Sequence, residues 1–306
     1  MTAVLRLSAA AKINLSLHIT GRRSDGYHYL DSLIGFTDVC DQLTVTPADD
    51  ITLSVVGPNG SAIEADDSNL VIRAARLVQK HLGVTSGAAF TLEKNTPVAA
   101  GLGGGSADAA AAVAACLALW GTPNSKPITD QILADELGAD VPVCRYGRAA
   151  HISGIGETIV PALNWPEVWM VLVNPRIALS TKDVFHAFDG EFDVERDRTF
   201  KGRSFNEFIK FLSTQKNSLT TPACLIAPQI KSVLEALEQM NGSALARMSG
   251  SGPTCFGLFE TQDLAEAAAR DLGQHHTAWW VKSTPLRVTT QTLAPNPTPN
   301  PRAVVT

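Results

Sequence analysis

A glycine-rich stretch at residues 97–107, PVAAGLGGGSA, is the segment of this chain best suited to bind a ligand through its backbone. Glycine weakens a helix and gives a strand no side chain to pack, so a cluster of glycines indicates that bare backbone is needed there. The stretch follows a predicted strand and begins an alanine-rich predicted helix. A helix N-terminus offers unpaired N–H groups and the positive end of its dipole, which predicts a phosphate-binding loop. Ser106 either caps the helix or donates to the phosphate.

Two familiar phosphate-binding loops fit this stretch poorly. A Walker A loop ends in Gly-Lys-Ser/Thr, but no lysine follows Gly105. A GxGxxG loop that starts at Gly101 would need a glycine where the chain has Ser106, and an acidic residue about 20 positions later. This spacing argues against a nicotinamide-dependent oxidoreductase. A tight strand-to-helix turn whose glycines only pack is the structural alternative.

A second loop, at residues 24–28, places Tyr27 beside His28. An aromatic ring stacked on a nucleobase contributes about 1–3 kcal/mol per base, and an imidazole or a backbone group is able to bond the edge of that base. The loop is therefore suited to hold a nucleobase. Ordinary loop packing is the alternative.

The elements predicted around these loops place them at strand and helix ends. Residues 11–19 alternate between apolar and polar side chains, which predicts a strand with Lys12 and Asn14 on its polar face. Helical spacing over residues 68–83 predicts a helix capped by Ser68. Further strands are expected at 42–48, 51–57, 88–97, 168–175, 254–260 and 277–286, and further helices at 106–121, 128–138, 227–241 and 261–274.

The irregular mixture of strands and helices predicts two α+β domains. We expect an N-terminal domain over residues 1–163, a C-terminal domain over 164–287 and a disordered Pro-rich tail over 288–306. The net charge of −5 argues against a general nucleic-acid binder. Five scattered cysteines favour a reducing cytoplasm, and no apolar run is long enough for a membrane span. A cytoplasmic protein that acts on a small molecule is expected, without nucleic-acid or membrane partners.

Several motifs in the right order resemble those of the GHMP kinases, a family named for its galactose, homoserine, mevalonate and phosphomevalonate substrates. PVAAGLGGGS at residues 97–106 is similar to the second family motif, and MSGSGPTCFGLF at 248–259 to the third. AKINLSLHITGRRSDGYHYLDSLI at 11–34 resembles the first motif, and NLVIRAA at 69–75 and GADVPV at 138–143 also match. The resemblance implies a kinase that uses ATP and Mg²⁺, with two α+β domains and the active site in the cleft between them.

The resemblance also implies a catalytic pair. Asp140 would accept the proton of the substrate hydroxyl, with Lys12 beside it. A positioned general base contributes about 10²–10⁴-fold to a rate, and a neighbouring ammonium keeps a carboxylate ionised. The alternatives without a catalytic role are a turn or cap residue for Asp140 and a solvated lysine for Lys12.

The first motif has the form found in one branch of the family, whose substrate contains cytidine diphosphate. It implies phosphorylation of the 2-hydroxyl of diphosphocytidyl-methylerythritol, on the methylerythritol phosphate route to isoprenoid precursors. Tyr27 and His28 would hold the cytosine, Phe185 would cover its other face, and Asn14 would bond polar groups of the substrate. Core packing is the alternative for Phe185.

The remaining residues implied by the resemblance surround ATP. Asn69 and Lys94 would lie near its nucleoside. The third motif would border the phosphates or the substrate through Gly250, Ser251 and Gly252, or it is a plain turn. The phosphate loop itself would comprise Pro97, Gly101, Leu102, Gly103, Gly104, Gly105, Ser106 and Ala107.

Two positions depart from the family pattern. Ala107 stands where a second serine is common, so one hydroxyl donor is absent, and Ser24 replaces a frequent proline. No carboxylate pair stands out as a Mg²⁺ ligand set, and the ion would be held by phosphates and water. The metal ligands therefore remain unassigned.

Two other functions remain as alternatives. Another GHMP kinase would act on mevalonate, homoserine or a sugar, but such substrates offer no base to stack on the Tyr27–His28 loop. A nucleotide-binding regulator without catalysis would need neither Lys12 nor Asp140. The sequence does not indicate the oligomeric state.

Overall fold

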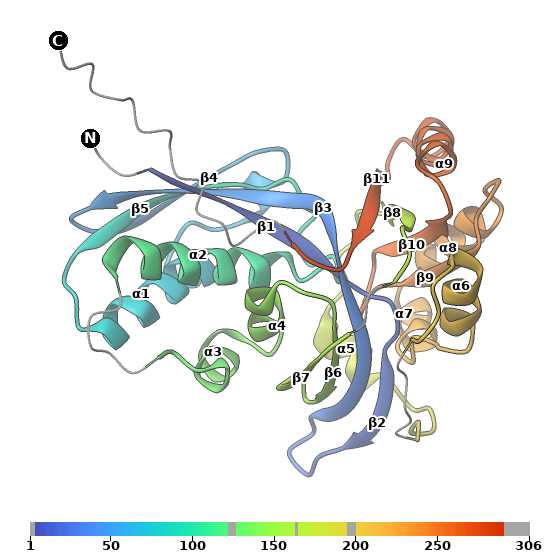
Figure 1. The fold of residues 1–306 in the computed structure, drawn as a ribbon, viewed down its shortest axis with the longest axis horizontal. Coiled ribbons are helices and arrows are strands. Elements are labelled where there is room, and N and C mark those ends of the chain that lie inside the picture. Colours follow the sequence, from blue (N-terminus) through green and yellow to red (C-terminus); the bar gives the residue numbers. More distant parts are fainter. Residues whose placement is uncertain (1–3, 122–126, 163–164, 195–199, 291–306) are drawn as a thin grey trace.

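The structure is a computed structural model that describes residues 4–121, 127–162, 165–194 and 200–290. Helices α1 to α4 gather at one end of a mixed sheet and α6 to α9 at the other (Figure 1). The strands are β1 (Leu5–Asn14), β2 (His18–Arg22), β3 (His28–Ala48), β4 (Ile51–Val56), β5 (Gly87–Glu93), β6 (Ala150–Gly154), β7 (Thr158–Pro161), β8 (Trp169–Asn174), β9 (Leu245–Met248), β10 (Cys255–Phe259) and β11 (Trp280–Arg287). The helices are the 3₁₀ turn η1 (Gly60–Ala62), α1 (Leu70–Leu82), α2 (Gly104–Trp120), α3 (Asp130–Leu137), α4 (Val141–Tyr146), α5 (Thr181–His186), α6 (Phe205–Ser213), α7 (Thr220–Ile226), α8 (Gln229–Glu238) and α9 (Gln262–His275).

One sheet runs through both halves of the described chain, in the order β4-β5-β3-β11-β8-β10-β9. The 21-residue strand β3 is its axis, because it pairs antiparallel with β1, β2, β5, β6 and β11. β11 also pairs with β8, so it joins the two halves. This mixed architecture confirms the predicted fold class. The predicted boundary at 163/164 and residues 291–306 of the predicted tail lie outside the described residues.

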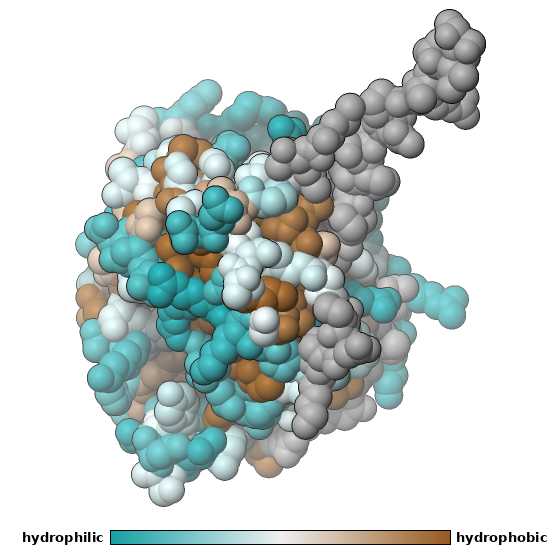
Figure 2. Space-filling view, turned by 90° about the vertical axis from the view of Figure 1, so that its left-hand side faces the viewer, coloured by the Kyte–Doolittle hydropathy of each residue, from teal (hydrophilic) through white to brown (hydrophobic). Residues whose placement is uncertain are grey.

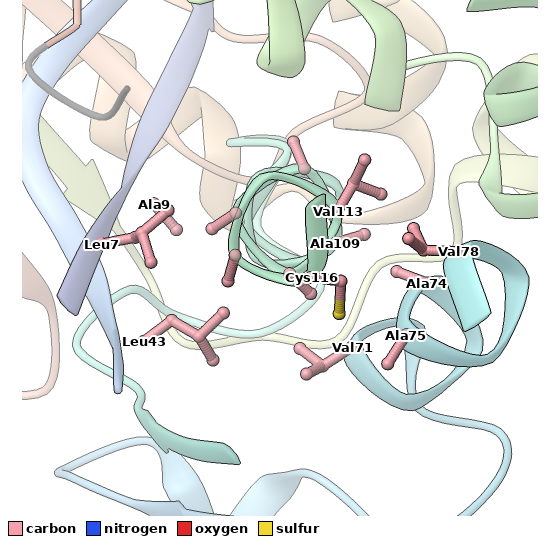
Figure 3. Close-up of a cluster of buried hydrophobic side chains, with 14 of the residues drawn as sticks. Leu7, Ala9, Leu43, Val71, Ala74, Ala75, Val78, Ala109, Val113 and Cys116 are labelled. Carbon is pink, nitrogen blue, oxygen red and sulfur yellow. The ribbon is translucent and has the colours of Figure 1, made fainter. Parts of the chain in front are cut away.

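Helix α2 forms the centre of the N-terminal core. Its alanine-rich sequence leaves little side-chain bulk, so neighbouring elements approach it from several sides. Figure 3 shows it between α1, which contributes Val71, Ala75 and Val78, and the strands that contribute Leu7 and Leu43. The predicted helix at 106–121 is confirmed as α2, and this packing fixes the direction in which its N-terminus points.

The predicted strand at residues 11–19 is wrong in its extent. β1 ends at Asn14 and β2 begins at His18. Between them the N–H of Leu17 donates to the carbonyl oxygen of Lys216 instead of to a strand of the sheet. The polar side chains of this segment are all buried, Lys12 included. The solvated-lysine alternative for Lys12 is therefore wrong, because the side chain lies beneath Gly103 and beside Asp140.

Two predicted helix caps are also corrected. Asn69, and not Ser68, caps α1, since its side chain accepts from the N–H of Val71. Gly103, and not Ser106, occupies the N-cap position of α2 in a left-handed conformation. Ser106 lies inside the first turn of the helix, where its hydroxyl is not needed as a cap.

Hydrophobic residues on the face shown in Figure 2 form separate patches between hydrophilic ones, which is usual for an exposed surface. Within the described ranges, no helix has the length and apolar character needed to cross a bilayer. All five cysteines are free thiols. The cytoplasmic location stays a prediction.

Candidate active site

The glycine loop is shaped by its contacts with two other motifs. Gly101 and Gly103 have positive φ angles of 71° and 62°. A Cβ on Gly103 would lie 2.6 Å from Cγ of Lys12, and the backbone N–H of Lys12 donates to the carbonyl of Leu102 at 3.0 Å. Glycine at position 103 therefore lets the loop pass directly over the Lys12 side chain.

The third motif packs against the same loop from the C-terminal half. A Cβ on Gly101 would lie 2.6 Å from the carbonyl oxygen of Ser249 and 2.7 Å from that of Gly252. The hydroxyl of Ser249 donates to the carbonyl of Gly101 at 3.0 Å and accepts from the N–H of Asn14 at 3.1 Å. The first, second and third motifs thus meet around one serine.

Lys12 and Asp140 form an ion pair, with Nζ and Oδ2 3.1 Å apart. Nζ of Lys12 also donates to Oδ1 of Asn14 at 2.6 Å, and Nδ2 of Asn14 donates to Oγ of Ser32 at 2.8 Å. Asp140 occupies the N-cap position of α4, but in the described structure its carboxylate does not cap the helix. The carboxylate is therefore held by Lys12 and not by the helix, and its partly exposed side chain is accessible to a bound substrate.

A first cavity of about 560 Å³ opens above the glycine loop. Lys12, Asn14 and Asp140 line it, together with Asn69 and Lys94. From the predicted phosphate loop it is lined by Pro97, Gly101, Gly103, Gly104, Gly105 and Ser106, and from the third motif by Gly250 and Ser251.

Two residues of the predicted loop lie behind this lining. Leu102 and Ala107 are buried in hydrophobic clusters. A serine hydroxyl in place of Ala107 would therefore enter the core. Alanine at this position lets α2 pack in the hydrophobic cluster without a buried hydroxyl group.

A second cavity, of about 690 Å³, is lined by Tyr27, His28 and Phe185. Tyr27 is 64% exposed, whereas His28 is buried with its ring centroid 5.6 Å from that of Phe185. Burial lowers the pKa of His28, and the positive charges of Arg22 and His186 lower it further. The imidazole is therefore neutral at neutral pH, with one nitrogen able to donate and one to accept.

The two cavities share part of their lining, including Ser106, Asp140 and Thr181. Thr181 begins α5, and its hydroxyl lies 2.9 Å from that of Ser251. Sequence reasoning missed Thr181, and its only signal was a helix start in LSTKD. Asp140 stands where a group bound in one cavity would meet a group bound in the other.

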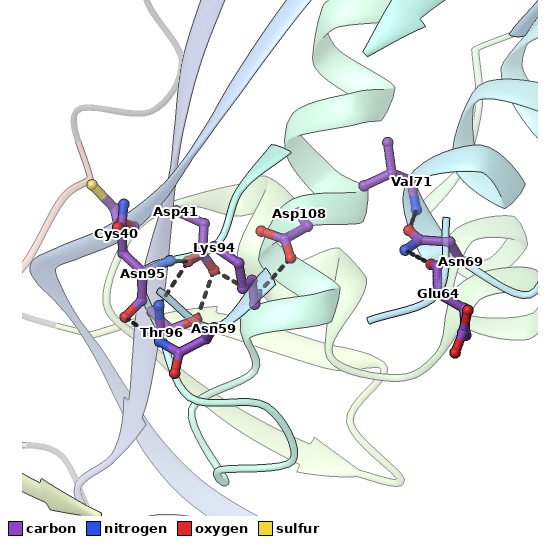
Figure 4. Close-up of polar contacts among 10 residues, drawn as sticks. All are labelled: Cys40, Asp41, Asn59, Glu64, Asn69, Val71, Lys94, Asn95, Thr96 and Asp108. Carbon is purple, nitrogen blue, oxygen red and sulfur yellow. Dashed lines mark hydrogen bonds and ion pairs between the residues drawn. The ribbon is translucent and has the colours of Figure 1, made fainter. Parts of the chain in front are cut away.

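Asn69 and Lys94 reach the first cavity from different surroundings. Asn69 caps α1 and donates through its side chain to the carbonyl of Glu64 (Figure 4). Lys94 is 2% exposed and contacts Asp41 and Asp108. These two aspartates were not predicted, because nothing in the sequence indicates that they are buried together.

ATP and Mg²⁺ differ in how well the described residues fit them. The bare loop at the N-terminus of the 17-residue helix α2 offers N–H donors to phosphates. No group of three or more His, Cys, Asp or Glu residues suited to a metal ion occurs in the described part of the chain. The described residues therefore fit a Mg²⁺ ion whose ligands are mainly phosphate oxygens and water.

Comparison with known proteins gives the same family in both halves of the chain. Residues 69–148 match the family described as GHMP kinases N terminal domain, and residues 200–278 match GHMP kinases C terminal. The 4-diphosphocytidyl-2-C-methyl-D-erythritol kinase of Paramagnetospirillum magneticum is 45% identical over 276 residues, which cover 90% of this chain and 96% of the relative. The kinase of that name from Rhodospirillum rubrum is 44% identical over 278 residues, 90% of each chain.

Comparison with solved structures indicates the same family of kinases. A crystal structure of 4-(cytidine 5'-diphospho)-2C-methyl-D-erythritol kinase is similar with a TM-score of 0.73 and 34% identity, over 92% of this chain and 99% of that chain. A homoserine kinase from Cytophaga hutchinsonii, with a TM-score of 0.70 and 17% identity over 94% and 96% of the two chains, shares the fold. This chain belongs to the GHMP kinases and, within them, to the family of the 4-diphosphocytidyl-2-C-methyl-D-erythritol kinases.

Proposed function

We propose that this chain transfers the γ-phosphoryl group of ATP to the 2-hydroxyl of 4-diphosphocytidyl-2-C-methyl-D-erythritol, in the methylerythritol phosphate pathway of isoprenoid precursor synthesis. The observation that carries the proposal is the position of Asp140, paired with Lys12 in the lining shared by the two cavities. ATP would occupy the first cavity with its phosphates on the glycine loop. The cytidine substrate would occupy the second.

In the proposed reaction the 2-hydroxyl oxygen forms a bond to the γ-phosphorus while the bond to the β,γ-bridging oxygen breaks and ADP leaves. Asp140 accepts the hydroxyl proton as the new bond forms. Lys12 pairs with Asp140 and offers positive charge to the attacking oxygen. Asn14 fixes Lys12 through the 2.6 Å hydrogen bond and is placed to bond the substrate.

The groups that surround ATP would act by position and charge. The N–H groups at the start of α2 and the Ser106 hydroxyl donate to phosphate oxygens, and Mg²⁺ would neutralise phosphate charge. Ser251 and its neighbours close the loop from the C-terminal half. Asn69 lines the first cavity and would contact the nucleoside, whereas the ammonium of Lys94 lies beside Gly104 and so nearer the phosphates than the predicted nucleoside position.

Substrate choice would depend on the second cavity. The exposed ring of Tyr27 offers a stacking face, Phe185 offers another, and the neutral imidazole of His28 is placed to bond the edge of a base. Mevalonate, homoserine and galactose have no planar base, so they would gain nothing from these rings. This is the reason for preferring the cytidine substrate to those of other GHMP kinases.

The test is ADP release from Mg-ATP with the cytidine substrate beside mevalonate, homoserine and galactose. We expect turnover with the cytidine substrate alone. Turnover with another of these alcohols would support a kinase but overturn the substrate-binding role proposed for Tyr27, His28 and Phe185. ATP binding without turnover on any alcohol would favour the non-catalytic regulator.

A further inference from the structure

A buried cluster of three charged side chains lies directly beneath the phosphate loop. Nζ of Lys94 is 2.6 Å from Oδ2 of Asp41 and 2.7 Å from Oδ2 of Asp108 (Figure 4). A Cβ on Gly104, the first residue of α2, would lie 3.0 Å from Nζ of Lys94. Asp108 and Lys94 also line the first cavity. Charge in this cluster is therefore close to any phosphate bound at the loop.

The two carboxyl groups of the cluster are held differently. Asp41 accepts hydrogen bonds from the backbone N–H groups of Asn95 and Thr96, at 2.6 and 2.8 Å, and from the Thr96 hydroxyl at 2.7 Å. With Lys94 this makes four donors, so in each of these bonds Asp41 acts as an acceptor, as a carboxylate does. Oδ1 of Asp108, in contrast, is buried without a hydrogen-bond partner among the described residues.

The protonation state of Asp108 sets the net charge of the cluster. Burial raises the pKa of Asp108 to about 7, with Asp41 raising it and Lys94 opposing the shift. Burial alone would lower the pKa of Lys94, but Asp108 and Asp41 raise it, so the ammonium stays charged. With Asp108 protonated, the cluster has one positive and one negative charge. With Asp108 ionised it has a net charge of −1, carried by side chains that are almost fully buried.

We propose that Asp108 is a positioning residue whose protonation keeps the cluster beneath the phosphate loop neutral, and that its ionisation weakens ATP binding. The proposal rests on the proposed function for the place of ATP. A negative charge beneath the loop repels phosphate and opposes the dipole of α2. ATP binding therefore favours the protonated form, and proton uptake must accompany binding.

Other charged or titratable groups around Asp108 do not provide this effect. Burial raises the pKa of Cys144 on α4 so far that its thiol stays neutral. Lys12 on β1 is paired with Asp140, and Glu64 lies exposed at the cavity lining. Helix α1 faces α2 through apolar side chains. Asp108 is the group of this set that titrates near neutral pH.

The first test measures the Kd for ATP as a function of pH, by calorimetry without the cytidine substrate, and compares wild type with Asp108→Asn. The amide is uncharged at every pH, accepts from Lys94 and donates to Asp41, so it mimics the protonated acid. Between about pH 6 and pH 8.5 we expect the wild-type Kd to rise on the order of threefold to tenfold relative to that of Asp108→Asn. Asp38→Asn, which removes an exposed carboxylate paired with Arg287, should follow wild type.

The nucleotide's own protonation is common to all three proteins and cancels in the ratio. Parallel pH profiles for wild type and Asp108→Asn would overturn the proposal. So would weaker ATP binding by Asp108→Asn at the higher pH, since that would assign Asp108 a direct need for its charge.

Two further readouts separate this proposal from the proposed function. Titrations of wild type in buffers of different ionisation enthalpy should show net proton uptake that is largest near about pH 7–8. No uptake there would contradict the proposal even if the variant failed to fold. Without ATP, the folded state of wild type holds the Asp108 proton over about pH 4–7 while the unfolded state releases it, so stability falls as pH rises through that window.

Asp108→Asn should therefore have the higher Tm above about pH 7 and lose this advantage near pH 4. Equal Tm values at the higher pH would contradict the role of Asp108. If these results hold but the cytidine substrate is not turned over, the proposed function fails while the role of the cluster stands.

Discussion

Lys12 and Asp140 differ in exposure, and the difference suits their separate tasks. The Lys12 side chain is 6% exposed and the Asp140 side chain 39% exposed. Lys12 must hold one charge in one place, so burial with Asn14 fixes it. In the proposed reaction Asp140 would take a proton from a bound substrate and later release it, which requires an open approach from the cavity.

Two neighbouring tyrosines allow a matched test of base stacking. Tyr27 lines the second cavity, whereas Tyr29, also exposed, packs against Gly21 and is not in that lining. Loss of a stacking face costs about 1–3 kcal/mol, so Tyr27→Ala should raise KM for the cytidine substrate about 5- to 150-fold and leave KM for ATP unchanged. Steady-state kinetics of both alanine variants checks this. An equal rise in KM in Tyr29→Ala would point to a general disturbance of the loop.

Residue types in motifs predicted Lys12 and Asp140, and the structure brings the pair together as expected. Nothing comparable marked Asp108, which in the sequence is an isolated aspartate in an alanine-rich helix. Its meaning depends on Asp41 and Lys94, which come from β3 and from the end of β5. Burial of a charge is a tertiary property, so local sequence did not reveal it.

At the scale of elements, the glycines of the phosphate loop serve two purposes. Gly101 gives room to another part of the protein, because the third motif occupies the space where its side chain would be. Gly105 faces the first cavity, and a Cβ there would meet only Cδ1 of Leu70, at 3.4 Å. Glycine at 101 is needed for packing, whereas in the proposed function glycine at 105 leaves room for a ligand.

This difference predicts opposite effects of two alanine substitutions. Gly101→Ala forces a side chain onto positive φ and into backbone oxygens, so we expect about 2–4 kcal/mol of destabilisation. Gly105→Ala improves helix propensity by about 0.5–1 kcal/mol, so its stability should be kept or raised while its ATP affinity falls. Denaturant unfolding and ATP titration measure both. A stable Gly101→Ala protein, or full ATP affinity in Gly105→Ala, would contradict the assignment.

The elements with regular apolar spacing were predicted from periodicity, whereas the length of β3 has a tertiary cause. The helices at 68–83 and 261–274 correspond to α1 and α9, because their apolar spacing and end signals agree. The predicted strand at 42–48 is only the last part of β3. The rest of β3 pairs with several strands in turn, and those partners are set by tertiary structure.

For the whole molecule, the two predicted domains share one sheet and a hydrophobic cluster. β11 pairs with both β3 and β8. One hydrophobic cluster contains Ala11 and Leu33 from the N-terminal part together with Phe256 and Trp280 from the C-terminal part. The active site lies across this shared region, so its halves are fixed relative to each other by packing.

A shared core predicts cooperative unfolding. We expect a single thermal transition, with the same midpoint by far-UV circular dichroism and by tryptophan fluorescence. ATP at about 100 times its Kd should shift this transition as a whole, by about 2.7 kcal/mol of added stability. Two separated transitions, with only one shifted by ATP, would show that the predicted domains unfold independently.

The most direct test of the account is the turnover of Asp140→Asn with Mg-ATP and the cytidine substrate. Asparagine keeps the shape of the side chain but does not accept the proton, so kcat should fall about 10²- to 10⁴-fold while ATP affinity stays near that of wild type. Asp130→Asn, which removes a surface carboxylate paired with Arg145, is the matched control and should keep wild-type kcat. Wild-type turnover by Asp140→Asn would contradict the claim that Asp140 is the base at this site.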